Sequence, residues 1–133
     1  MTGLVLKLAP NERVLINGAV IENGERRGCI SIKTPKVNIL RLRDAIHPED
    51  ATTPVSRACY DAQLVLSGDR DNDKGRRVLL RNLEQLSQVF EDRDSRKIIA
   101  QATSAVIEEN FYRALRLLRD LLPREARLLA AAK

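Results

Sequence analysis

The sequence contains very few aromatic residues, and this limits how it could bind a nucleic acid. Its 133 residues include two Tyr, two Phe and no Trp, and none of the four lies before residue 60. Domains that stack RNA bases on a sheet depend on aromatic side chains across the sheet face. That mode of binding is therefore disfavoured for the β-rich first part of this chain.

The residue types that build catalytic and metal sites are also scarce. His47 is the only histidine, precedes Pro48, and has no recognisable metal or nucleophile partner. Neither a glycine-rich phosphate loop nor a Ser/His/Asp pattern occurs. The acidic stretch 69–73 is similar to the beginning of a calcium-binding loop. However, Lys74 stands where the loop needs Gly, and Leu80 stands where it needs a bidentate Glu. We expect a solvated linker there, no metal, no cofactor and no enzymatic activity.

Cysteines and long apolar runs are equally rare. Cys29 and Cys59 form no metal-binding spacing, and we expect two buried thiols rather than a disulfide. No apolar run approaches the roughly 18 residues of a membrane span. The first residues lack a basic flank, an apolar run and a small-residue cleavage site, which predicts no signal peptide and a cytoplasmic location.

What the sequence does have is an uneven charge. Residues 1–43 carry eight bases and three acids, whereas residues 44–133 carry 15 of each, so the whole net charge of +5 lies in the first third. A concentrated positive field suits a polyanion partner, because neutralised phosphates release their counterions. The alternative is a basic face that is simply solvated.

The hydrophobic pattern changes near residue 44 and predicts an α+β fold. Before it, short runs rich in Val, Ile and Leu predict an antiparallel β-meander of four or five short strands, at residues 4–8, 14–16, 20–22, 29–33 and 37–42. After it, helical periodicity predicts a C-terminal bundle of four or five helices. We expect a basic β-rich lobe at 1–46 and a helical lobe at 50–133 in one cooperative domain.

Helix boundaries follow from capping residues. Thr53 and Pro54 should start a helix that runs to about Leu66. Later helices are expected at residues 75–90 and 95–109, and one capped by Asn110 should end at Leu122 because Pro123 follows.

Two sequence blocks carry a family resemblance. The first spans residues 10–20, where Asn17-Gly18 predicts a tight hairpin turn, and the second is Asp50-Ala51-Thr52-Thr53-Pro54 with the following Tyr60 and Gln63. The chain resembles the FlbT family of bacterial regulators of flagellin synthesis. The resemblance implies a protein that binds the flagellin mRNA leader and lowers its translation or lifetime. Gln63 could face a partner or bond a neighbouring loop, and the loop is the expectation.

Residues 12–46 also resemble, more weakly, the CsrA family of translational regulators. The similarity runs through residues 12–20, Ile30-Ser31-Ile32, Thr34-Pro35-Lys36 and 41–46. It implies RNA contacts on the first strand and near Arg43. Ala45 replaces the second acid of that motif, and about one residue is inserted after Lys36.

The candidate RNA contacts are the basic residues of the β-rich lobe. Each could instead be a solubilising charge, and Arg43 could pair with Asp44 or Glu49. The candidates are Arg13, Arg26, Arg27, Lys33, Lys36, Arg41 and Arg43.

A second class of function is a protein-interaction module. The helical lobe could dock flagellin or its small companion FlaF as a secretion co-chaperone, with an indirect effect on mRNA. An apolar stripe would form the docking surface, although we expect its residues to belong to the core rather than to an interface. The stripe comprises Leu115, Leu118, Leu122, Leu128 and Leu129. Exposed sheet edges further predict a homo-oligomer, most simply a dimer closed through the β-rich lobe.

Overall fold

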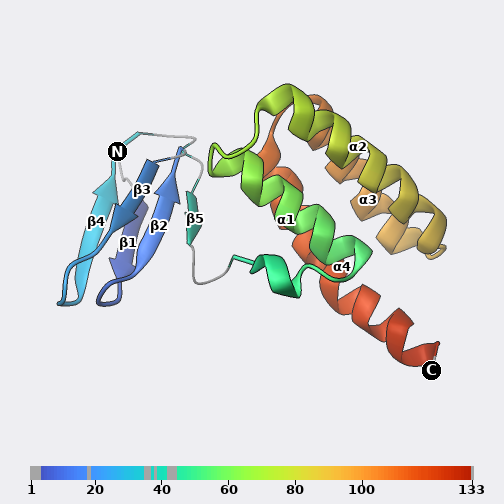
Figure 1. Cartoon of the computed structure of the whole chain (residues 1–133), viewed down its shortest axis with the longest axis horizontal. Helices are drawn as coiled ribbons and strands as arrows, with labels where there is room; N and C mark the ends of the chain where they lie inside the picture. Colours follow the sequence, from blue (N-terminus) through green and yellow to red (C-terminus); the bar gives the residue numbers. More distant parts are fainter. Residues whose placement is uncertain (1–3, 18, 35–36, 38, 42–44, 133) are drawn as a thin grey trace. The chain divides into compact units, whose positions relative to one another are not determined.

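The computed structural model describes residues 4–17, 19–34, 37, 39–41 and 45–132, with the Val20 side chain left out. The chain divides into two compact units, Met1–Ala45 and Ile46–Lys133, which we call the β unit and the helical unit. Five strands precede four α-helices (Figure 1), so the predicted α+β class is confirmed.

The strands of the β unit form two small antiparallel sheets. One sheet has two strands in the order β1-β4, and the other has three in the order β3-β2-β5. The strands are β1 (Leu4–Leu8), β2 (Arg13–Ile16), β3 (Ala19–Glu22), β4 (Gly28–Ile32) and β5 (Ile39–Arg41). Strand positions therefore agree with the prediction, but the pairing is not that of a simple meander.

The first four strands are two arms of one long, bent hairpin. Leu8 pairs with Gly28 at the end of one sheet, and Arg13 pairs with Glu22 at the start of the other. Between these pairs, four residues (9–12) lie opposite five (23–27). An extra residue on one arm bends a ribbon, as in a β-bulge. The pair Asn23-Gly24 is part of this bend.

Asn23 stabilises the bend through its side-chain amide. Its Nδ2 donates to the carbonyl oxygens of Ala9 at 2.8 Å and Arg26 at 2.9 Å. The Asn11 backbone N–H donates to the Gly24 carbonyl at 2.8 Å, which joins the two arms directly. The backbone groups that regular strand pairing leaves unpaired are thereby satisfied.

The tip of the hairpin is the predicted two-residue turn. Ile16 pairs with Ala19, so Asn17 and Gly18 connect the strands. Asn17 has a φ of 49°, the left-handed conformation that a type I′ turn requires and Asn tolerates. Gly18 itself lies outside the described residues.

The core of the β unit is small. Leu8, Val14, Leu15 and Leu40 are its buried apolar residues among those described. Cys29, predicted to be buried, is instead exposed on β4. The reason is strand alternation, because the half-buried Ile30 and Ile32 occupy the opposite face.

In the helical unit, each helix contacts two others: α1 packs on α2 and α4, and α3 packs on the same two. The helices are α1 (Pro54–Leu66), α2 (Asn72–Val89), α3 (Arg93–Ile107) and α4 (Phe111–Ala131), preceded by the short 3-10 helix η2 (Pro48–Asp50). Leu79, Leu83, Leu115, Leu118 and Phe90 are among the fully buried side chains. None of the helices in the described part of the chain is long and apolar enough to cross a membrane.

The start of α1 is as predicted and shows how its backbone donors are satisfied. Thr53 and Ser56 form a capping box, with Pro54 in the first turn. The Val55 N–H donates to Oε2 of Glu125 in α4 at 2.9 Å. Glu125 is buried, so its carboxylate joins two helices and lies where the helix dipole favours a negative charge.

Two helix boundaries differ from the prediction. Helix α2 begins at Asn72, about a turn early, because Asp71 caps it by accepting from the Lys74 N–H at 2.7 Å. Helix α4 continues through Pro123 to Ala131. Beyond the proline it buries Glu125, whose bond to Val55 helps offset the lost helical hydrogen bond.

Candidate nucleic-acid interface

Arg13 lies on one face of the β2–β3 hairpin, directly opposite Glu22, and is paired with it. Its Nε donates to Oε1 of Glu22, the residue directly opposite on β3, at 2.7 Å. Both side chains are more than half exposed, at 60% and 54%. An exposed pair of this kind is weak, so Arg13 could exchange Glu22 for a phosphate at small cost.

Arg41 lies on the opposite face of the sheet and is held much more firmly. It pairs with Val14 across the strands, and therefore shares a face with that buried residue and with Glu12. Arg41 Nε donates to Glu12 Oε2 at 2.7 Å, and Nη2 donates to Glu12 Oε1 at 3.1 Å and to the Lys7 carbonyl. The Glu12 side chain is only 5% exposed. This geometry favours a structural role for Arg41 over an RNA contact.

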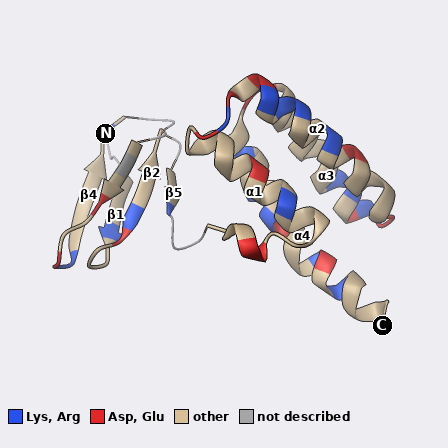
Figure 2. Cartoon of the chain, in the orientation of Figure 1, with Lys and Arg blue, Asp and Glu red and all other residues tan. Residues whose placement is uncertain are grey.

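Arg26, Arg27 and Lys33 are exposed near the two ends of β4. The two arginines lie in the bend that precedes β4, and Lys33 directly follows β4. Within the described part of the chain, none of the three has an ion-pair partner. Figure 2 shows the basic residues of this unit on its strands and bends. Lys36 and Arg43, the other two candidates, lie outside the described residues. The predicted similarity to CsrA near Arg43 therefore also lies outside the described residues.

One further base belongs with this group and was absent from the predicted contacts. Lys7 is exposed on β1, where it lies opposite Cys29 of β4. The alternation of side chains along β1 could have predicted that Lys7 is exposed, since Leu6 and Leu8 flank Lys7 and point to the other face.

The second sequence block forms structural contacts. Gln63 Oε1 accepts from the Ile46 N–H at 2.7 Å, and Gln63 Nε2 donates to the Ile46 carbonyl at 3.0 Å. Gln63 is buried, so the expected bond to a neighbouring loop is confirmed. His47 accepts from the Glu49 N–H through Nδ1 at 3.3 Å and caps η2.

Two titratable groups of the helical unit have pKa values shifted from their ordinary ones. Burial raises the pKa of the Cys59 thiol to about 12, with Arg119 opposing the shift and Glu125 adding to it. Hydrogen bonds from Ser95 lower the pKa of Asp92, which caps α3. No group of three His, Cys, Asp or Glu residues in the described ranges could hold a metal ion.

The leucine stripe of α4 divides into a buried and an exposed part. Leu115 and Leu118 are fully buried, as expected of core residues, and Leu122 is half-buried. Leu128 and Leu129 are 42% and 48% exposed, contrary to that expectation. The last turns of α4 project past the other helices (Figure 1), and these two residues are only partly covered by the bundle.

A comparison with protein-family models places this geometry in a family. Residues 4–129 match the model described as "Flagellar protein FlbT", a range that includes both units. The chain belongs to the FlbT family. The match includes the hairpin around Asn17 and the Thr53-Pro54 helix start, the two blocks that carried the sequence resemblance.

Curated FlbT relatives align along most of the chain. A "Probable flagellum biosynthesis repressor protein FlbT" from Caulobacter sp. (strain K31) is 28% identical and covers 92% of both chains. Another from Mesorhizobium japonicum is 32% identical, covering 95% of this chain and 84% of the relative. The "Flagellum biosynthesis repressor protein FlbT" of Caulobacter vibrioides is 27% identical, covering 92% and 86%. No solved structure matches significantly. A regulatory role in flagellar synthesis follows from these names.

Proposed function

We propose that this FlbT-family chain is a non-enzymatic, cytoplasmic regulator that binds the leader of flagellin mRNA and represses its translation or stability. Support comes from relatives named as repressors of flagellum biosynthesis. The observation that carries the proposal is the exposed basic group Arg26, Arg27 and Lys33, which has no acidic partner in the described part of the β unit.

The pairing of the other arginines sharpens the expected interface. Glu12 and Glu22 engage Arg41 and Arg13, so these acids neutralise bases that are not in the exposed group. Glu25 is exposed next to Arg26 in the bend, so the exposed bases Lys7, Arg26, Arg27 and Lys33 outnumber the one acid among them by three. Contacts between such bases and RNA phosphates release counterions, which gives affinity that falls steeply with salt.

The direct test is a salt-dependent binding titration with flagellin leader RNA. We expect Arg26→Gln with Arg27→Gln to weaken binding and to reduce the slope of log K against log salt by about 0.7 for each lost phosphate contact. The matched control removes two exposed bases of α3, Arg93→Gln with Lys97→Gln, and should leave the slope unchanged. A double variant at 26 and 27 that binds like the parent would overturn this interface.

The second candidate, a co-chaperone of flagellin or FlaF, is favoured by the exposed end of α4. Leu128 and Leu129 offer an apolar surface that the helical bundle does not use. If this function is the primary one, the parent should show no RNA affinity until flagellin or FlaF is added. Leu128→Ser with Leu129→Ser should then abolish capture of the added protein, whereas the variants at 26 and 27 should not.

A further inference from the structure

A polar cleft of about 550 Å³ lies between α1 and α2 in the helical unit. Arg57 and Asp61 line it from α1, and they share a helix face because they are four residues apart. Val78, Asn82 and Gln85 line it from α2 at spacings of four and three, which also place them on one face. The volume lies within the range of small-molecule sites.

Asp61 organises the floor of this cleft. Its Oδ1 accepts from Arg70 Nη1 at 2.9 Å, and its Oδ2 accepts from Asn82 Nδ2 at 2.7 Å. Both side chains of the Asp61–Arg70 pair are about one-fifth exposed. These bonds fix the Asn82 amide so that its Oδ1 and second N–H remain for a ligand. The Asp61 charge is also offset by Arg70, so it does not repel an anion strongly.

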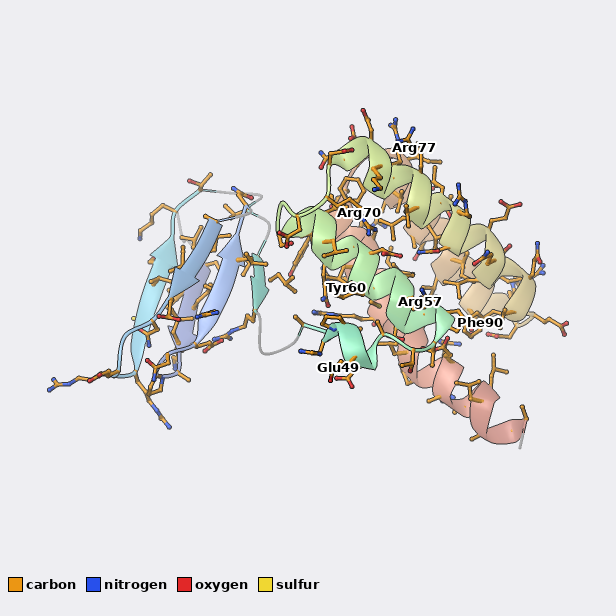
Figure 3. All side chains as sticks on the ribbon, in the orientation of Figure 1. Glu49, Arg57, Tyr60, Arg70, Arg77 and Phe90 are labelled. Carbon is orange, nitrogen blue, oxygen red and sulfur yellow. The ribbon has the colours of Figure 1, made fainter. Side chains whose placement is uncertain are left out.

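Two lining side chains have no such internal partner in the described part of the chain. Arg57 is exposed and has no carboxylate to pair with, and Gln85 is exposed on the opposite wall. Figure 3 labels Arg57 on α1 and Arg70 in the turn that follows α1. A guanidinium, a primary amide and a second, oriented amide therefore line one cleft.

We propose that this cleft binds an unpaired nucleotide of single-stranded RNA and reads its base. Arg57 contacts the phosphate, Asn82 and Gln85 hydrogen-bond the base edge, and Val78 with Pro54 provides apolar contact. Sequence-specific RNA recognition targets unstacked bases, and amides pair well with base edges because they donate and accept together. This inference rests on the proposed function and adds to it the source of sequence selectivity.

The β unit by itself provides charge rather than base recognition. Its exposed candidates Arg26, Arg27 and Lys33 suit phosphates, and phosphate contacts position a protein without identifying sequence. A regulator of one transcript needs groups that distinguish bases. The α1–α2 cleft offers such groups within the helical unit.

A protein ligand fits the cleft less well. The apolar lining consists of Val78 and Pro54, whereas binding hot spots between proteins are well-packed, desolvated pockets. A peptide carboxylate on Arg57 is the competing occupant, and the experiment below distinguishes it.

The test compares the affinities for flagellin leader RNA and for a scrambled RNA of the same length and composition. We expect the full-length double variant Arg57→Ala with Gln85→Ala to weaken binding of both RNAs through the lost phosphate contact, and to lower the leader-to-scrambled affinity ratio by about tenfold or more through the lost base contact of Gln85. The matched control, Arg77→Ala with Gln88→Ala, removes the same residue types from exposed positions of α2 that do not line the cleft and should keep the ratio. In a second measurement, 5′-AMP and 5′-UMP should shift the Gln85 side-chain amide signal in an NMR titration.

The outcomes separate this inference from the proposed function. If the parent distinguishes the two RNAs and the cleft variant distinguishes them equally well, the cleft does not read the base, and the inference is wrong. The proposed function is then unaffected. A parent that binds neither RNA overturns the proposed function, and the nucleotide titration then decides the cleft alone. If the amide signal responds to a flagellin C-terminal peptide and to neither nucleotide, the cleft is a peptide site and the inference is wrong.

Discussion

At the scale of single residues, two glutamates decide which arginines of the β unit remain for a ligand. Glu22 holds Arg13 through an exposed pair, and Glu12 holds Arg41 through a nearly buried one. The same two residue types therefore contribute differently to stability. The exposed pair exchanges readily, whereas removal of either partner from the Glu12–Arg41 pair leaves the other charge without its counterion in a poorly solvated site.

Arg41→Gln should lower the free energy of unfolding, because it leaves the Glu12 carboxylate buried without its guanidinium. We expect a loss of about 2 kcal/mol, less than the roughly 3–5 of a fully buried pair, since Arg41 is 22% exposed. Arg13→Gln, the matched change at the exposed pair, should cost about 0.5 kcal/mol. Urea unfolding followed by circular dichroism measures both, and equal costs would contradict the distinction.

Cys59 gives the structure a dependence on alkaline pH. Burial raises its pKa to about 12 from a reference value of 9.0, so the thiol stays neutral in the folded state after the unfolded chain has ionised. Stability contributed by this group is therefore complete below about pH 9 and is lost as pH rises toward 12. The melting temperature of the parent should fall more than that of Cys59→Ala between about pH 8 and about pH 11. Parallel decreases would show that Cys59 is not responsible.

At the scale of secondary-structure elements, α1 and α2 approach closely at a glycine of α2. A Cβ on Gly75 would lie 2.2 Å from Val65 Cγ2, a separation at which either the Val65 side chain or one of the helices must shift. The carboxyl end of α1 therefore meets the first turns of α2 at this point. The cleft lined by Arg57 and Gln85 lies between the same two helices.

Gly75→Ala should destabilise the protein even though alanine is the better helix former. We expect overpacking of about 1–3 kcal/mol, partly offset by about 1 kcal/mol of helix propensity. The added change Val65→Ala removes the clashing methyl groups, so the double variant should recover part of the loss. A thermal unfolding cycle with both single variants measures this coupling. Additive effects would mean that the two residues do not contact each other.

The sequence predicted these elements well where a local signal decides the structure. Thr53 and Pro54 marked the start of α1, and Asn17 marked the hairpin turn, because capping and positive φ depend on residues close in the chain. It did not reveal that Arg41 pairs with Glu12, since that depends on the pairing of β5 with β2. For the same reason, the extension of α4 through Pro123 depended on the distant bond between Glu125 and Val55.

The α1–α2 cleft shows the same limit for the candidate site. Asp61 and Asn82 are 21 residues apart, and no local pattern indicates that one would orient the other. The basic group near Arg26 could be predicted, because charge distribution is a property of composition. Which other bases of the β unit are paired, namely Arg13 and Arg41, could be known only from the strand register.

At the scale of the whole molecule, the edge strands of the β unit predict assembly. β1 pairs with β4 in a sheet of two strands, and Leu4 and Val5 are 53% and 56% exposed. An exposed apolar edge is a site for pairing with another chain. The predicted dimer through the β unit would cover these residues, and a two-fold interface would bring two copies of the basic group into one particle.

Light scattering should therefore give the mass of two chains at tens of micromolar, a concentration that populates complexes of modest affinity. Val5→Lys places a charge on the exposed edge of β1 and should shift the mass to one chain, because like charges would oppose pairing. Ile107→Lys, a change of the same kind at a 57% exposed position of α3, is the control and should leave the dimer intact. A monomeric parent would contradict the prediction, and a dimer broken by Ile107→Lys and not by Val5→Lys would place the interface on the helical unit. If the β-unit dimer holds, its disruption should also lower the affinity for leader RNA, since two linked basic groups bind one polyanion more tightly than either alone.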